Sequence, residues 1–191
     1  MRFSVLMFFC VLTVRAQLIQ ESNAHDWQVP SQIKQCAVSM VPLAISSIKL
    51  DYSVNPFYLR GDFDGDGFMD LAIALRGVTD DTKSATGICR AKGRSVLLGS
   101  LAKGHVFNDD IAESVPSAGW TVVSRDALLQ ILRLSKPPRQ RVSGLRKKLA
   151  QVKGEIIYMP YEDGEGAILY VYGHFEWYTI NSVLFPQDIQ K

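Results

Sequence analysis

A cluster of aspartates and glycines at residues 61–70, GDFDGDGFMD, restricts the folding of this chain more than any other feature of its sequence. Four carboxylates fall within nine residues, and such charges repel one another unless a cation lies between them. The interspersed glycines allow tight backbone turns that direct alternate side chains towards one centre. The stretch therefore predicts a metal-binding loop over residues 61–73. The predicted carboxylate ligands are Asp62, Asp64, Asp66 and Asp70.

Calcium is the cation that this ligand set favours. It takes oxygen ligands in a flexible geometry, whereas zinc prefers nitrogen and sulfur and magnesium demands a small regular octahedron. The backbone carbonyl of Phe68 is predicted to supply one further oxygen. The alternative is a polar turn between two strands, in which the Asp-Gly pairs serve only as hairpin residues.

The residues that follow the loop distinguish it from an EF-hand. An EF-hand needs Glu at position 12, where this chain has Ile73, and residues 71–75 read as a strand that enters a core. The stretch 57–76 instead resembles the FG-GAP/VCBS type of calcium loop, which connects two strands. Such loops occur in several copies on β-propellers, so the single copy here argues against a propeller.

The chain is also similar to small exported bacterial proteins that carry one loop of this type. In those proteins a helix precedes the loop and a hairpin comes late, at the place that residues 167–180, AILYVYGHFEWYTI, occupy here. Most of them have no assigned activity. The resemblance therefore implies calcium binding and export, and no particular reaction.

The first residues have the pattern of a secretory signal peptide. Arg2 precedes an apolar stretch over residues 3–14, and Val14 and Ala16 stand at the −3 and −1 positions before Gln17. The alternative is a buried N-terminal helix or strand. The stretch is too short to cross a bilayer, and no later segment of the sequence is long and apolar enough. We therefore expect a signal peptide at residues 1–16 and a product exported to the periplasm or the extracellular space.

Export would place the remaining cysteines in an oxidising compartment. Cys10 would leave with the signal peptide, so Cys36 and Cys89 could pair. A bridge between them would close a loop of about 54 residues and stabilise the fold by about 4 kcal/mol. The alternative is two buried thiols that never meet.

Hydrophobic periodicity predicts a mixture of strands and helices within one domain at residues 17–191. Helices are expected from Ser31 to Pro42 and over residues 125–134, and residues 79–93 are expected to form a polar loop. The predicted strands are residues 54–60, 70–76, 94–98, 120–124, 155–159, 167–172 and 175–180. Because strands outnumber helices without regular alternation, the expected fold class is α+β. We predict a mainly antiparallel sheet, two or three helices and one strand–calcium-loop–strand unit.

Residues 133–153 form a basic segment with eight Lys and Arg and no acid. One interpretation is a surface for an anionic partner, and the other is a solvated helix face. The segment lacks the aromatic residues that stacking on bases requires, which argues against nucleic acid. Because the charge has one sign, we expect the segment to be exposed and dispensable for folding. Charge reversal at Lys147 and Lys148 would then change the stability by less than about 0.5 kcal/mol.

No catalytic constellation stands out in the sequence. His174 and Glu176 share one face of a predicted strand, which the pleat alone explains. We therefore predict an exported, non-enzymatic calcium-binding module whose ion orders the loop. The alternative is an exported hydrolase or inhibitor that acts on an envelope or polymeric substrate and holds calcium only for structure.

Overall fold

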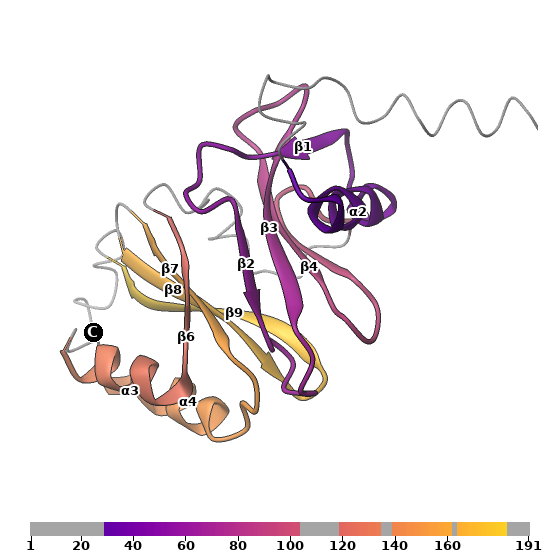
Figure 1. The fold of residues 1–191 in the computed structure, drawn as a ribbon. Helices are drawn as coiled ribbons and strands as arrows, with labels where there is room; N and C mark the ends of the chain where they lie inside the picture. Colours follow the sequence, from indigo (N-terminus) through magenta and orange to yellow (C-terminus); the bar gives the residue numbers. More distant parts are fainter. Residues whose placement is uncertain (1–28, 104–118, 135–138, 162–163, 183–191) are drawn as a thin grey trace, which may run out of the picture.

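Two antiparallel sheets pack against each other in the computed structural model, which describes residues 29–103, 119–134, 139–161 and 164–182 (Figure 1). The first sheet has the order β1-β3-β4-β5, and β2 pairs with β3. Its strands are β1 (Ile48–Leu50), β2 (Tyr58–Gly61), β3 (Asp70–Gly77), β4 (Ser84–Cys89) and β5 (Val96–Gly99). The second sheet runs in chain order through β6 (Thr121–Val123), β7 (Ile156–Tyr161), β8 (Gly164–Val171) and β9 (His174–Ser182).

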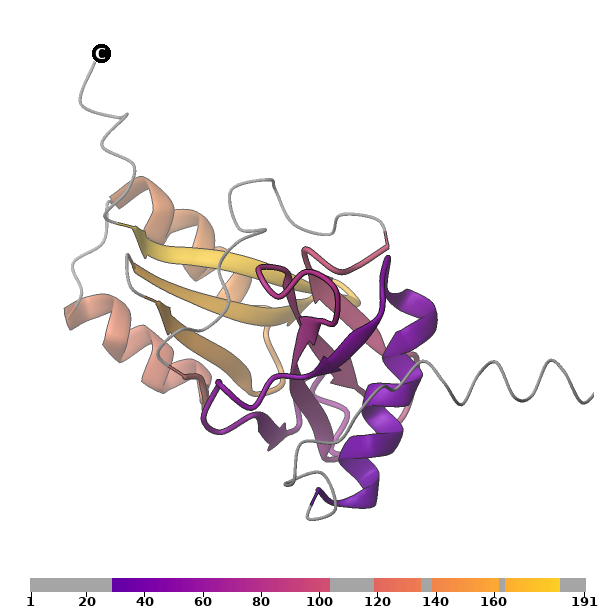
Figure 2. The same cartoon turned by 90° about the horizontal axis from the view of Figure 1, so that it is seen from above.

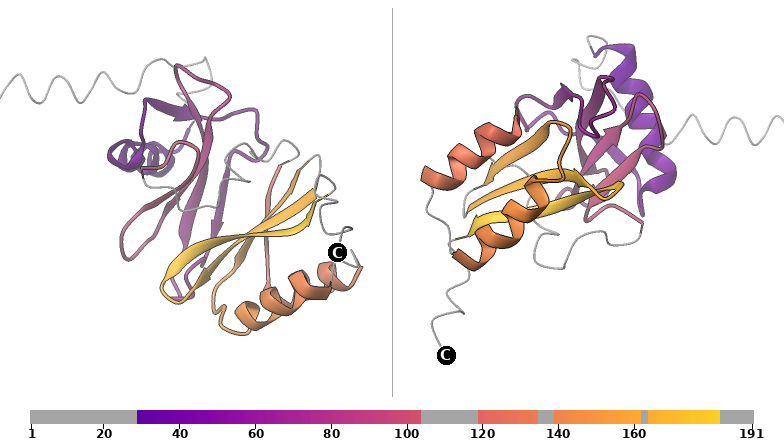
Figure 3. Two further views of the ribbon diagram at one scale, coloured as in Figure 1. Left: turned by 180° about the vertical axis from the view of Figure 1, so that it is seen from behind. Right: turned by 90° about the horizontal axis from the view of Figure 1, so that it is seen from below.

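Helices cover the outer faces of both sheets, which gives four layers. Helix α2 (Ser31–Met40) lies on the first sheet and is followed by a short 3₁₀ turn, η2 (Val41–Leu43). Helices α3 (Arg125–Leu134) and α4 (Arg139–Leu149) lie on the second sheet. Figures 2 and 3 show α2 on one side of the molecule and the α3–α4 pair on the other. No helix among the described residues is long and apolar enough to span a membrane.

The alternation of strand β3 explains why the first sheet is covered on both faces. Leu71, Ile73 and Leu75 point to α2, whereas Ala72 and Ala74 point to the second sheet. Small side chains on the inner face let the two sheets approach each other, and larger residues fill the space around them. The inner core between the sheets contains Leu59, Phe63, Ile88, Leu98, Trp120, Ile157, Met159, Ile168 and Phe175.

The α+β class, the antiparallel pairing and both predicted helices are confirmed. Each predicted strand overlaps an observed one, although the strand expected at residues 54–60 begins only at Tyr58. The single sheet was wrong, because β1 to β5 and β6 to β9 form separate sheets. The predicted loop at residues 79–93 was also wrong, since it contains β4. This strand is made of small residues, SATGIC, and it forms because β3 and β5 pair with its two edges. The predicted signal peptide lies outside the described residues.

The expectation that the whole basic segment is exposed is wrong. Within it, α4 packs Leu145 and Leu149 against the second sheet, and Val152 is buried just beyond the helix. These positions form the buried apolar stripe of an amphipathic helix, whereas Arg146 and Lys147 are exposed. Lys148 is not free either, because its ammonium pairs with Glu176 on β9. The segment is therefore one wall of the outer core of the second sheet.

Candidate metal centre

The aspartate loop connects β2 to β3 at one end of the first sheet. These strands pair in antiparallel fashion, and the last pair in the register is Gly61 with Asp70. The two ends of the loop are therefore neighbours, which brings Asp62 near Asp70 although eight positions separate them. Gly65 and Gly67 both have positive φ, at 75° and 86°, a conformation that glycine adopts without steric cost.

Three of the predicted ligands come together. Each of Asp62, Asp64 and Asp70 offers a carboxylate oxygen, and these oxygens all lie within 4.8 Å of one another. Asp64 and Asp70 are buried, with exposed fractions of 7% and 2%, and Asp62 is half-buried. Three carboxylates at this spacing form an oxygen-only donor set that suits a hard cation such as Ca²⁺. This acidic trio of Asp62, Asp64 and Asp70 could hold a metal ion.

Backbone amides hold the acidic trio in place. Asp62 accepts hydrogen bonds from the amides of Gly65 and Asp66 through Oδ1, at 2.9 and 3.0 Å, and from Gly67 through Oδ2, at 2.9 Å. Asp70 accepts from the amide of Phe63 at 3.1 Å and from that of Ala91 at 2.8 Å. The loop backbone therefore wraps around the Asp62 carboxylate, and the carboxylates of Asp64 and Asp70 lie close to it.

The charges of the trio act on one another. Burial raises the pKa of Asp70 above its usual value, and the nearby carboxylates of Asp64 and Asp66 raise it further. The hydrogen bonds from Ala91 and Phe63 lower this pKa and so oppose the shift. A cation at the centre would favour the ionised form of each carboxylate, because it replaces like-charge repulsion with attraction.

Asp66 and Phe68 lie at the outer side of the loop. Asp66 is exposed and does not belong to the acidic trio; its Oδ1 accepts a hydrogen bond from the amide of Phe68 at 2.9 Å. The ring of Phe68 is 45% exposed and carries the ammonium of Lys92 at 3.3 Å from its centroid. As metal ligands, Asp66 and the Phe68 carbonyl therefore stay predictions.

Two charged neighbours of the trio were missed by the sequence analysis. The guanidinium of Arg90 pairs with Asp64 and lies over the Tyr170 ring of β8, 5.2 Å from its centroid. Glu155, just before β7, accepts a hydrogen bond from the amide of Asp62 at 2.9 Å and donates its own amide to the Asp62 carbonyl at 2.7 Å. Both contacts join the loop to the second sheet.

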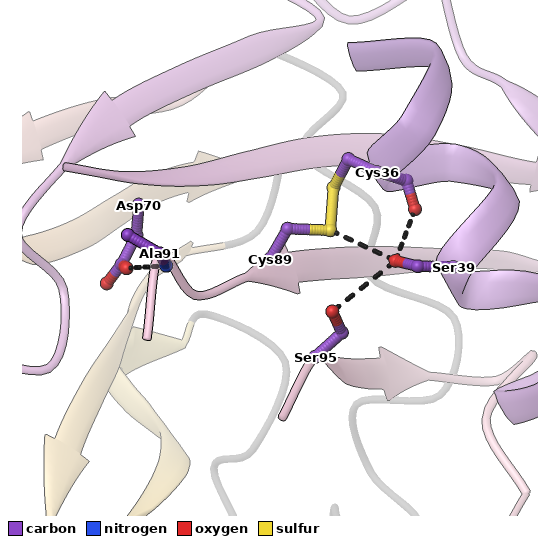
Figure 4. Close-up of a disulfide and its surroundings, with 6 residues drawn as sticks. All are labelled: Cys36, Ser39, Asp70, Cys89, Ala91 and Ser95. Carbon is purple, nitrogen blue, oxygen red and sulfur yellow. Dashed lines mark hydrogen bonds between the residues drawn. A yellow bond between two sulfur atoms is a disulfide. The ribbon is translucent and has the colours of Figure 1, made fainter. Parts of the chain in front are cut away.

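The disulfide that was predicted is present next to this site. Cys36 on α2 and Cys89 at the end of β4 are bonded, with their Cα atoms 5.8 Å apart. The next two residues, Arg90 and Ala91, are the ones that contact Asp64 and Asp70. Figure 4 shows that Cys89 of the disulfide and Ala91, which donates to Asp70, lie on the same segment of chain. The bridge therefore fixes the strand end that supports the trio, and it is consistent with an oxidising compartment.

His174 and Glu176, the other pair that the sequence analysis considered, take part in polar contacts between β9 and α4. The imidazole Nε2 of His174 lies 2.8 Å from Glu176, and the same carboxylate contacts Lys148 and accepts the Tyr178 hydroxyl at 2.9 Å. His174 is largely exposed. Because Glu176 on β9 pairs with Lys148 on α4, these contacts connect the second sheet to its helix, and this structural role accounts for them.

No protein-family model, no curated protein and no solved structure matches the chain.

Proposed function

We propose that the chain is an exported, non-enzymatic calcium-binding module. The observation that carries this proposal is the convergence of the Asp62, Asp64 and Asp70 carboxylate oxygens within 4.8 Å of one another. The ion would be held by these three groups together with Asp66 and the Phe68 carbonyl. Sequence similarity to FG-GAP/VCBS loops and the Cys36–Cys89 disulfide support calcium and export, respectively.

The structural role of the ion follows from the neighbours of the trio. Asp62 is hydrogen-bonded to Glu155, which immediately precedes β7, and Asp64 pairs with Arg90, which contacts Tyr170 of β8. An ion that removes the repulsion between the carboxylates would therefore order the loop and stiffen the junction between the two sheets. The alternative function, an exported hydrolase or inhibitor, stays a prediction on which none of these contacts bears.

Calorimetric titration of the metal-free protein with CaCl₂, MgCl₂ and ZnCl₂ tests the proposal. We expect one calcium site with a dissociation constant of about 10⁻⁴ to 10⁻³ M, as in extracellular modules, and weaker binding of the other two ions. Asp62→Asn should abolish binding, whereas Asp81→Asn, an exposed aspartate outside the loop, should not change it. Tighter binding of zinc, or equal loss in the two variants, would contradict a calcium site in this loop.

A further inference from the structure

The aspartate loop shares one end of the molecule with two other connections. Strand β4 ends at Cys89, opposite Leu71 of β3, so the connection from β4 to β5 begins beside the aspartate loop. The turn between β8 and β9 lies at the same end, because Arg90 pairs with Asp64 and also covers the ring of Tyr170 near the end of β8. Figures 1 and 3 show this turn beside the loop between β2 and β3. We call the three connections together, residues 62–69, 90–95 and 172–173, the loop tip.

Three large apolar side chains are exposed on the loop tip. Phe68 and Met69 of the aspartate loop are 45% and 63% exposed, and Tyr172 of the β8–β9 turn is 70% exposed. In the described part of the chain, the other exposed large hydrophobic side chains lie apart from one another, on α2, after η2 and at the end of α3; they are Val38, Ile45 and Leu134. The loop tip is therefore the one place in this part of the chain where three such side chains gather, and all three come from connections at the ends of strands.

Basic side chains lie among these apolar ones. The ammonium of Lys92 lies over the Phe68 ring, 3.3 Å from its centroid, and Arg94 is exposed on the same connection. Lys153 is exposed on the other side of the aspartate loop, where a Cβ added to Gly65 would lie 2.6 Å from the Lys153 Cβ. Lys and Arg can keep their charged groups at a lipid phosphate while their alkyl stems and neighbouring rings enter the apolar layer.

The net charge at this end of the molecule depends on whether the acidic trio holds an ion. Acids and bases in and beside the loop tip are equal in number, so without an ion their charges balance. The acids are Asp62, Asp64, Asp66, Asp70 and Glu155, and the bases are Arg60, Arg90, Lys92, Arg94 and Lys153. A calcium ion bound to the trio would leave two positive charges in excess. The ion would therefore change the loop tip from balanced to cationic.

We propose that calcium docks the loop tip on an anionic lipid surface; this rests on the proposed calcium binding. The excess positive charge attracts anionic head groups, and Phe68, Met69 and Tyr172 enter the boundary between head groups and acyl chains. Calcium takes about six to eight oxygen ligands, so lipid phosphate oxygens can complete a set that the loop begins. A protein partner fits less well, because the apolar side chains of the tip alternate with charged ones, which are depleted in the core of protein interfaces.

Sedimentation of the disulfide-bonded protein with lipid vesicles tests the proposal. The vesicles consist of phosphatidylcholine alone or of equal parts phosphatidylcholine and phosphatidylglycerol, and each is used in EDTA and in millimolar calcium. We expect calcium to tighten binding to the phosphatidylglycerol vesicles by about tenfold, because the ion adds two positive charges near the surface. Binding to phosphatidylcholine alone should be weak in both buffers. Asp62→Asn should remove the response to calcium.

One pair of variants tests the apolar contribution. Met69→Gln combined with Tyr172→Asn should weaken binding in calcium by about tenfold, because two exposed apolar side chains no longer enter the lipid. Asn is chosen at position 172 because φ is 52° there, a conformation in which Asn is enriched. The matched control is Ile45→Gln combined with Leu134→Gln, two exposed apolar residues outside the loop tip, which should leave binding unchanged.

A second pair of variants tests the charge. Lys92→Gln combined with Arg94→Gln should weaken binding by about twentyfold, since each basic side chain near an anionic surface contributes about fivefold. The matched control is Arg146→Gln combined with Lys147→Gln, which makes the same charge change at exposed positions of α4. This control should leave binding unchanged, and it separates the loop tip from the basic segment.

Each of the other outcomes overturns the proposal. Equal vesicle binding in EDTA and calcium, or none at all, by a protein that calorimetry shows to bind calcium would refute the docking and leave the calcium site intact. No calcium binding in calorimetry would refute both. Equal binding to the two kinds of vesicle would remove the role of the anionic head group. Equal weakening in a tip variant and its control would place the contact outside the loop tip.

Discussion

The first sheet with α2 and the second sheet with α3 and α4 have the same plan, a sheet covered by helix on its outer face, but they differ in what holds them. The first is bridged by the Cys36–Cys89 disulfide and carries the aspartate loop. In the second sheet the strands are adjacent in chain order, and aliphatic side chains pack the sheet against α3 and α4. The acidic trio lies in the first region. The second region contacts the loop directly through Glu155, and indirectly through Tyr170, which contacts the Arg90 that pairs with Asp64.

The largest expected effect is on the first region alone. The disulfide joins residues 53 positions apart, so its reduction should lower the free energy of unfolding by up to about 4 kcal/mol. Denaturant unfolding with and without reductant measures the loss. Hydrogen exchange should show amides of β3 and β4 losing protection before those of β8 and β9. Equal midpoints in both buffers, or free thiols in the oxidised protein, would contradict the difference between the regions.

Removing one aliphatic side chain should damage the second region. Leu149 is 1% exposed in the core between α4 and the sheet, and Leu149→Ala should cost about 3 kcal/mol because it leaves a cavity. Leu134→Ala is the control, since Leu134 is 75% exposed and the same change there should cost less than about 0.5 kcal/mol. Similar urea midpoints for both variants would show that α4 is not part of the core.

The junction between the two regions is sensitive at Gly65. Its φ is 75°, and an added Cβ would lie 2.6 Å from the Cβ of Lys153, just before β7. Gly65→Ala should therefore cost about 1 to 2 kcal/mol from backbone conformation, with a further steric term. Gly144→Ala, at a helical position with open space, should not destabilise the protein. If both variants melt at the wild-type temperature, the loop does not pack on the second sheet.

The smallest effect concerns the basic segment. Lys148 pairs with Glu176 and lies 4.6 Å from the centroid of the Tyr178 ring, but it is about one third exposed, so solvent screens the interaction. Lys148→Gln should cost about 0.5 to 1 kcal/mol, and Lys147→Gln at the exposed neighbouring position about zero. Chemical unfolding of the two variants side by side checks this. An equal change in the free energy of unfolding of both variants would show that the Lys148–Glu176 pair does not contribute to stability.

Local patterns in the sequence predicted local structure. The alternation at residues 167–172 and 175–180 gave β8 and β9, and the Asp-Gly spacing brought Asp62, Asp64 and Asp70 together. Both signals depend on neighbours along the chain, within one strand or one turn. For this reason the sequence alone was enough to predict β8, β9 and the acidic trio.

Features that depend on distant partners were missed. β4 has weak strand signals of its own and forms because β3 and β5 flank it. Arg90 is 26 positions from Asp64, and Glu155 is 93 positions from Asp62. Local residue spacing therefore could not predict either contact. In the basic segment the spacing of Leu145 and Leu149 was visible, but the charges dominated the interpretation. Long-range pairing also decided that two sheets form.

Thermal unfolding of the wild-type protein in EDTA and in millimolar calcium tests the central claim, that the aspartate loop holds a calcium ion. An ion that binds only the folded protein should stabilise it by about 1.4 kcal/mol at ten times the dissociation constant and by about 2.7 kcal/mol at one hundred times. We therefore expect a higher midpoint in calcium, and no such rise for Asp62→Asn. The same midpoint for the wild type in both buffers would show that the loop is only a polar turn.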